Sequence, residues 1–209
     1  GTEYLARATT PRAPSPVEEL DKAASALERA RTLNPEHVVP WFYEGEVHLA
    51  RATRQRDSGA DAGPALMRAR EAYLRGVAIN PRLPPLHNGL GTVGFEQAKD
   101  AWERGGDPEP SLREALKSFE QAIALAPAQG YGQNNVGEVH AWRARMRVLE
   151  GRSPEAEVKA ARVALKDALE KVPDLAQPWM NLGTALQAEA EWRRTRGQSV
   201  EPVLAEAVQ

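Results

Sequence analysis

Apolar and small residues recur along this chain at the spacing of one helix face. In the stretch before Pro81 they are Leu66, Ala69, Tyr73 and Gly76. The same face returns in steps of 46 residues, with the further members Leu20, Ala23, Leu27, Ala30, Val77, Leu112, Ala115, Phe119, Ala122, Ile123, Val158, Ala161, Leu165, Ala168 and Leu169. This pattern predicts an amphipathic helix in each repeat, which we call helix B.

A second helix, which we call helix A, is predicted from about residue 39 to 57 and again from 85, 131 and 177. Its middle carries a column of glycines, Gly45, Gly91, Gly137 and Gly183. A glycine inside a helix costs about 1 kcal/mol relative to alanine, so a compensating contact is expected. We predict that the backbones of neighbouring helices approach each other closely at these glycines.

The helix boundaries repeat in the same register. The prolines that follow each B pattern lie 46 residues apart, at Pro35, Pro81, Pro127 and Pro173. Side chains that can accept a hydrogen bond from the first N–H groups of helix B also recur every 46 residues, at Ser15, Asp61, Asp107, Ser153 and Ser199. Two residues before four of these caps, a left-handed end to the preceding helix is expected at Gly59, Gly105, Gly151 and Gly197.

These repeats predict one array over residues 1–209, with units at about 38–83, 84–129 and 130–175, a partial unit at 176–209 and a preceding partial unit at 1–37. A single helical hairpin cannot bury its apolar face, so the units are expected to pack on one another. Ala6 aligns with Ala52, so residues 1–10 are expected to be the second half of an earlier helix A, with both ends cut from a longer array. The alternative is that residues 1–14 form a linker.

Two half-signatures carry a family resemblance: Trp179, Leu182 and Gly183 in helix A, and Ala69 with Tyr73 and Pro81 in helix B. This pattern resembles the tetratricopeptide repeat (TPR) family over nearly the whole chain, with a period of 46 residues where the family has 34. The resemblance implies an all-α fold, a right-handed α-α superhelix built as a TPR-like solenoid of antiparallel helix hairpins.

The stop at residues 106–108, Gly-Asp-Pro, is also similar to those of TPR arrays attached to bacterial serine/threonine kinases. No kinase motif accompanies it: the sequence lacks a Gly-rich phosphate loop, an HRD and a DFG. We therefore expect a signalling connection through a larger parent protein, and no catalysis by this chain.

Charge and composition limit the partners. The 27 Lys and Arg residues against 29 Asp and Glu give a net charge of −2, which disfavours nucleic acid. There is no cysteine, so disulfides and thiolate metal sites are excluded. No apolar run approaches the roughly 20 residues that span a bilayer. We expect a cytoplasmic protein with no membrane contact, no metal and no cofactor.

In the resembled family the inner face of the A helices binds the ligand. Projected here, this concave face consists of Phe42, Glu46, Asn88, Thr92, Phe95, Asn134, Glu138, Trp142, Met180 and Thr184. An Asn amide can pair with both the N–H and the C=O of an extended peptide, whereas the glutamates favour a basic or neutral segment. The family's clamp for a peptide carboxylate is not reproduced. The alternative is that this face is solvated and its aromatic side chains pack between repeats.

Two other groups invite a functional interpretation. His48 and His140 occupy the column where the family has a packed aromatic residue, so packing is favoured over metal binding. Arginines gather near the ends of the A helices, at Arg54, Arg56, Arg145, Arg147, Arg193, Arg194 and Arg196. Complementarity to the helix dipole accounts for them, and a basic ridge for an acidic partner is the alternative.

The predicted function is that of a non-catalytic scaffold that binds a peptide or protein on its concave face, as a fragment of a larger signalling protein. The first alternative is a self-associating module whose exposed repeat ends stack on other copies. A third is a regulatory domain that binds a small ligand for an attached enzyme. An enzyme is disfavoured because the sequence has no HExxH motif and no phosphate-cradling loop.

Overall fold

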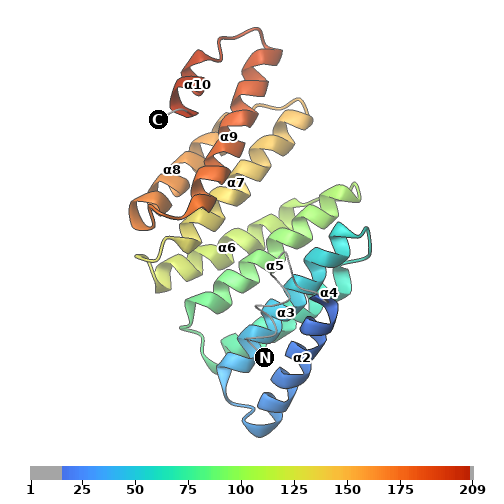
Figure 1. The fold of residues 1–209 in the computed structure, drawn as a ribbon. Helices are drawn as coiled ribbons and strands as arrows, with labels where there is room; N and C mark the ends of the chain where they lie inside the picture. The colour runs from blue at the N-terminus through green and yellow to red at the C-terminus, as the bar shows by residue number, and fades with distance from the viewer. Residues whose placement is uncertain (1–15, 208–209) are drawn as a thin grey trace. The chain divides into compact units, whose positions relative to one another are not determined.

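The computed structural model describes residues 16–207, and within that range it contains nine α-helices and no strand (Figure 1). The helices are α2 (Pro16–Leu33), α3 (Val38–Asp57), α4 (Gly63–Ile79), α5 (Pro84–Glu103), α6 (Glu109–Leu125), α7 (Tyr131–Leu149), α8 (Glu155–Lys171), α9 (Ala176–Thr195) and α10 (Glu201–Ala207). The all-α prediction is confirmed for this part of the chain.

The predicted alternation of A and B helices is also confirmed. The A helices are α3, α5, α7 and α9, which begin at residues 38, 84, 131 and 176, within one residue of the predicted starts. The B helices are α2, α4, α6, α8 and α10. The predictions of an earlier helix A and of a cap at Ser15 concern residues 1–15, which lie outside the described residues.

Helices that are consecutive in the sequence pack against each other within two compact units, residues 1–125 and 126–209. In the first unit α3 packs on α4 and α5 on α6, and α4 also contacts α5. In the second unit α7 packs on α8 and on α9, and α9 contacts α10. The continuous array and its superhelical form stay predictions.

The predicted B face is the core of both units. In the first unit, Leu66, Ala69 and Tyr73 of α4 are at most 2% exposed and pack with Leu86 and Val93 of α5. In the second unit Ala161 and Leu165 of α8 are 0% exposed and pack with the A helices through Ala141 and Ala185. Burial of these faces is the main source of stability for the helix pairs.

The glycine column in the A helices has a different explanation from the predicted one. A Cβ at Gly45 would lie 2.4 Å from the ring of Tyr73, one at Gly91 2.4 Å from the ring of Phe119, and one at Gly137 2.4 Å from the Leu165 side chain. Large side chains of the paired B helix, and not neighbouring backbones, therefore occupy these spaces. At Gly183 no atom of the described residues lies within 4 Å of such a Cβ.

The helix boundaries follow the predicted chemistry. Asp61 and Asp107 accept hydrogen bonds of 3.0 Å from the N–H groups two residues later, and Ser153 and Ser199 do so at 3.4 and 3.3 Å. The preceding glycines are left-handed, as at Gly105 with φ +73°. Left-handed backbone is nearly free for glycine and costly for other residues, so these positions end the A helices.

An N–H donor near the start of helix A joins each of three A helices to the loop before it. Trp41 Nε1 donates to Pro35 O at 3.2 Å, His87 Nε2 to Pro81 O at 2.8 Å and Gln133 Nε2 to Pro127 O at 3.1 Å. Three different side chains, each 46 residues after the last, thus donate the same hydrogen bond to a proline carbonyl six residues earlier. The pattern was not recognised in the sequence because the residue types differ.

Candidate functional site

The predicted concave-face residues lie on A helices that contact each other within each unit, α3 with α5 and α7 with α9. We call this set the A face. Phe42, Glu46, Asn88, Thr92 and Phe95 belong to the first unit. The second unit holds the remaining five, which are Asn134, Glu138, Trp142, Met180 and Thr184.

In the first unit the A face is largely engaged in internal packing. The Phe42 ring centroid lies 5.0 Å from that of Tyr43 and 6.2 Å from that of Tyr73. Glu46 Oε1 accepts a 2.5 Å hydrogen bond from the Tyr73 hydroxyl. Burial raises the pKa of Glu46, and this hydrogen bond offsets part of the rise. Phe95 is 4% exposed, beneath the Lys99 ammonium at 4.2 Å.

Asn88 and Thr92 lie half-buried on α5. The Thr92 hydroxyl donates to the backbone carbonyl of Asn88 at 3.0 Å. Asn88 Oδ1 is buried and has no hydrogen-bond partner in the part of the chain that the structure describes. These two side chains are thus oriented partly by their own helix.

In the second unit the A face is divided. Asn134 is 5% exposed and accepts a 3.0 Å hydrogen bond from Asn181 Nδ2. This amide pair joins α7 to α9, and Asn181 was not among the predicted residues. Met180, in contrast, is 64% exposed. Thr184 is half-buried and donates to the Met180 carbonyl at 3.1 Å.

A further member of the same helical stripe, Tyr131, lies at the start of α7 and is 52% exposed. Glu138 and Trp142 follow it on α7 at helical spacing and are half-buried. The second unit therefore has two exposed apolar side chains, Tyr131 and Met180, on adjacent A helices, whereas the A-face residues of the first unit are half-buried or buried.

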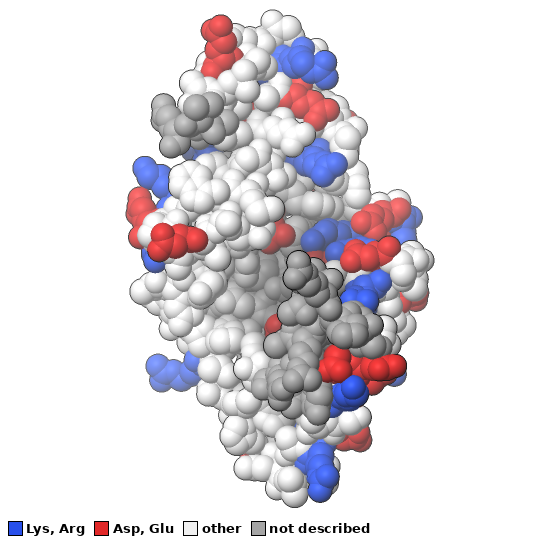
Figure 2. Space-filling model, viewed as in Figure 1, with Lys and Arg blue, Asp and Glu red and all other residues white. Residues whose placement is uncertain are grey.

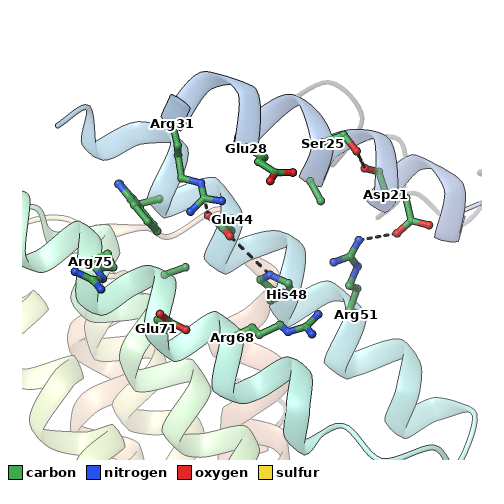
Figure 3. Close-up of a pocket in the computed structure, with 13 residues that line it drawn as sticks. Asp21, Ser25, Glu28, Arg31, Glu44, His48, Arg51, Arg68, Glu71 and Arg75 are labelled. Atoms are coloured by element: carbon green, nitrogen blue, oxygen red, sulfur yellow. Dashed lines mark hydrogen bonds and ion pairs between the residues drawn. The ribbon is translucent and has the colours of Figure 1, made fainter. Parts of the chain in front are cut away.

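A charged cavity of about 640 Å³ lies in the first unit between α2 and α4, with α3 as its floor (Figure 3). We call it the α2–α4 groove. Its lining includes His48 and Trp41 of the floor helix, together with four arginines and four carboxylates. These charged residues are Arg31, Arg51, Arg68, Arg75, Asp21, Glu28, Glu44 and Glu71. Its volume falls in the range of small-ligand sites.

Half of these charges are paired. Arg51 Nη2 lies 2.6 Å from Asp21 Oδ1, and Arg31 Nε lies 3.0 Å from Glu44 Oε2. The Arg31 guanidinium also stacks over the Trp41 ring, 4.5 Å from its centroid, which is a cation–π contact. These pairs join the middle of α3 to the two end regions of α2.

The floor of the groove is electrostatically divided. The pKa of Glu44 is raised by burial and by the nearby Glu71 and Glu28, against the opposing effect of Arg31. The pKa of His48 is lowered to about 4, by burial and then by three arginines. Glu44 therefore lies near two other carboxylates and Arg31, and His48, one helical turn away on α3, lies near three arginines.

A second groove of the same construction lies one repeat further on, between α4 and α6. Its volume is about 460 Å³. Eight residues line this groove, and each lies 46 positions after a residue that lines the α2–α4 groove. They are Arg70, Leu74, His87, Leu90, Glu114, Lys117, Ser118 and Gln121. Leu90 stands in place of Glu44, so this groove lacks the floor carboxylate. The charged columns were visible in the sequence, but their common cavity was not.

The arginine clusters pair with buried or half-buried carboxylates within their own units. Arg56 Nη1 pairs with Glu96 Oε2, and Arg193 Nη2 lies 2.8 Å from Glu189 Oε1. Arg147 lies 3.4 Å from Glu157, which is 6% exposed. On the face drawn in Figure 2, basic and acidic side chains of the described residues lie interspersed. Three members of the predicted ridge are thus already paired.

His140 also belongs to such a cluster. Its Nδ1 forms a 2.7 Å hydrogen bond with Glu157 Oε2. Burial raises the pKa of Glu157, but this hydrogen bond and the charges of Arg143 and Arg147 outweigh it, so the pKa is lowered. In the described residues no group of three or more His, Asp or Glu side chains is arranged to hold a metal ion. His48 is buried, as predicted, whereas His140 joins an ion-pair network.

Within residues 16–207 no helix combines the length and the apolar character needed to cross a membrane. No protein-family model and no curated protein matches this chain.

Proposed function

We propose that the chain is a non-catalytic scaffold that binds an extended peptide segment of a protein partner on its A face. The observation that carries this proposal is the pair of adjacent A helices in the second unit, on which Met180 is 64% and Tyr131 52% exposed. Aromatic and Met side chains are enriched where proteins bind one another. The Asn134–Asn181 hydrogen bond holds these two helices in register beneath them.

The likeness of the repeats to the TPR family supports the same use of the A helices, in a chain whose repeats are longer. A link to a kinase or another signalling enzyme belongs to this proposal and would be supplied by the parent protein. Glu138 adds negative charge to the face, so the preferred segment is basic or neutral and carries an apolar anchor.

The test is a selection of peptides from a random displayed library on the purified chain, followed by affinity measurements by fluorescence polarisation. We expect Met180→Asp and Tyr131→Asp each to weaken the selected peptides about tenfold or more, because a charge replaces an apolar anchor. Val163→Asp and Leu149→Asp are the matched controls, since these side chains are 66% and 62% exposed on other positions of the second unit.

If the selected peptides bind Met180→Asp as tightly as the unaltered chain, the A face is not the binding surface. Sedimentation at several concentrations separates the self-association alternative. A dimer that dissociates on the same two substitutions, with no peptide selected, would replace the peptide proposal by self-association.

A further inference from the structure

His48 leaves an unusual gap in the hydrogen bonding of the α2–α4 groove. The residue is 8% exposed, and its Nδ1 is buried with no hydrogen-bond partner among the described residues. Its Nε2 lies 4.0 Å from Glu44 Oε1 (Figure 3), too far for a hydrogen bond. Nε2 therefore has no hydrogen-bond partner among the described residues, and a bound group beside Glu44 can donate to it.

The gap suits an ammonium. With a pKa of about 4, His48 is neutral near pH 7, and a neutral imidazole has one nitrogen that accepts a hydrogen bond. An ammonium between His48 Nε2 and Glu44 Oε1 can donate to both atoms. Glu28 of α2 and Glu71 of α4 line the same cavity, and both add negative potential at Glu44.

The other partner in the groove is an arginine. Arg68 of α4 lines the cavity and is exposed, and no carboxylate of the described residues lies within 4.0 Å of it in an ion pair. Figure 3 shows Arg68 extending from α4 beside His48, across the groove from α2. A guanidinium forms a bidentate pair with a carboxylate, so Arg68 is placed to receive one next to the ammonium position.

The charge balance of the cavity favours a ligand that carries both signs. The four arginines and four carboxylates of the lining cancel, and His48 is neutral. A ligand of single charge would leave one charge without compensation in a partly buried site, which is costly. A zwitterion preserves the balance.

We propose that the α2–α4 groove binds a small zwitterion, a free amino acid or a short peptide, with its ammonium between Glu44 and His48 and its carboxylate on Arg68. This site is separate from the A face, so it adds a small-molecule ligand to a protein-binding scaffold. The α4–α6 groove is a control within the chain. There Leu90 replaces Glu44, Gly94 replaces His48 and Glu114 replaces Arg68 in the 46-residue register, so all three groups that hold the zwitterion are missing.

The test is a titration of the ¹⁵N-labelled full chain with each of the twenty free L-amino acids and with glycylglycine, followed by backbone amide chemical shifts. We expect at least one probe to shift amides of α2, α3 and α4, and none to act on α5 and α6 alone. For the best probe, its Nα-acetyl and carboxamide derivatives each lack one charge. Both should bind about tenfold or more weakly to the unaltered protein.

Glu44→Gln keeps the size of the side chain and Arg68→Gln shortens it; each removes one charge and should weaken binding about tenfold. Glu114→Gln, in the second groove, is the matched control and should leave binding unchanged. The proposal is overturned if no probe shifts these amides at a concentration of about 10 mM, where a site with a Kd near 1 mM would be mostly occupied. It is also overturned if the singly charged derivatives bind as well as the parent, a result that needs no variant to fold. Met180→Asp should not alter the binding of the amino acid probe. The test of the groove and the test of the A face can therefore have different outcomes.

Discussion

Tyr73 connects three features of the first unit through one side chain. Its ring lies where Gly45 and Gly89 have no Cβ, since a Cβ on either would lie 2.4 Å from a ring atom. Its hydroxyl donates to Glu46, so the ring can be 0% exposed without losing its polar group. Small residues on two A helices and a carboxylate on one of them are therefore parts of the same packing arrangement.

The glycine column provides a matched pair of substitutions. Gly91→Ala places a methyl group 2.4 Å from the Phe119 ring, and we expect it to lower the free energy of unfolding by about 2 kcal/mol. The methyl group of Gly183→Ala meets no atom within 4 Å in residues 16–207, and the higher helix propensity of alanine should raise the free energy of unfolding by up to about 1 kcal/mol. Urea denaturation followed by circular dichroism measures both. Equal effects of the two substitutions would contradict this account of the column.

His48 predicts a pH dependence of stability. Its pKa is lowered from 6.5 to about 4 in the folded chain, by burial and then by Arg51, Arg68 and Arg31. Between these values the unfolded chain binds more protons than the folded one, so the free energy of unfolding falls as the pH is lowered from about 6.5 to about 4. The full effect is about 3 kcal/mol.

We expect His48→Gln to remove most of this fall when denaturation is measured at several pH values across the window. His87→Gln is the control, because glutamine already performs the same hydrogen bond at Gln133. The same pH slope in the His48 variant and the unaltered chain would show that this imidazole is not responsible.

Helix ends in this chain combine a glycine and an acceptor side chain within three residues. Gly105 ends α5 with φ +73°, and Asp107 accepts from the N–H of Glu109 at the start of α6. A Cβ at Gly105 would have no atom of the described part of the chain within 4 Å, so the glycine is required by its backbone conformation and not by space.

A substitution series at Gly105 tests that conclusion. Gly105→Ala should lower the free energy of unfolding by about 1 kcal/mol, since an L residue is strained in left-handed backbone. Gly105→Asn should cost less, because asparagine tolerates this conformation better than alanine does. Thermal unfolding of the three proteins gives the order. Alanine and asparagine variants of equal stability would indicate that the backbone changes conformation instead.

The two compact units bury separate sets of core residues. The cluster around Tyr73 is built from α3, α4 and α5, and that around Leu165 from α7, α8 and α9. Each cluster joins helices that are close in the sequence, which is typical of repeat proteins, where local interfaces supply the stability.

Leu165→Ala therefore has a defined expected range. The side chain is 0% exposed, and its truncation should destabilise the second unit by about 2–5 kcal/mol. Hydrogen exchange should show reduced amide protection in α7, α8 and α9, with α3 and α4 unchanged. Val163→Ala on the same helix is the control, because Val163 is 66% exposed. Equal losses of protection in α3 and α8 would show that the chain unfolds as one cooperative block.

The 46-residue period was sufficient to predict the helices and their buried faces. Helix starts at residues 38, 84, 131 and 176 agree with the pattern, and the B-face residues such as Ala69 and Leu165 are buried. These features depend on contacts between near neighbours in the chain: turns of one helix, a capping side chain and the loop beside it. Local chemistry of this kind repeats wherever the residues repeat, so it can be inferred from spacing.

The cavities and polar partners were decided by contacts between different elements. Glu44, His48 and Arg68 are 4 and 20 residues apart, and only the packing of α3 between α2 and α4 brings them to one groove. The cause of the glycine column was also decided by the tertiary structure. A glycine in the sequence shows that a Cβ is absent, but not whether a backbone or an aromatic ring packs against that position. Side-chain packing depends on the relative placement of helices to within an ångström or so, and a repeat period contains no information at that precision.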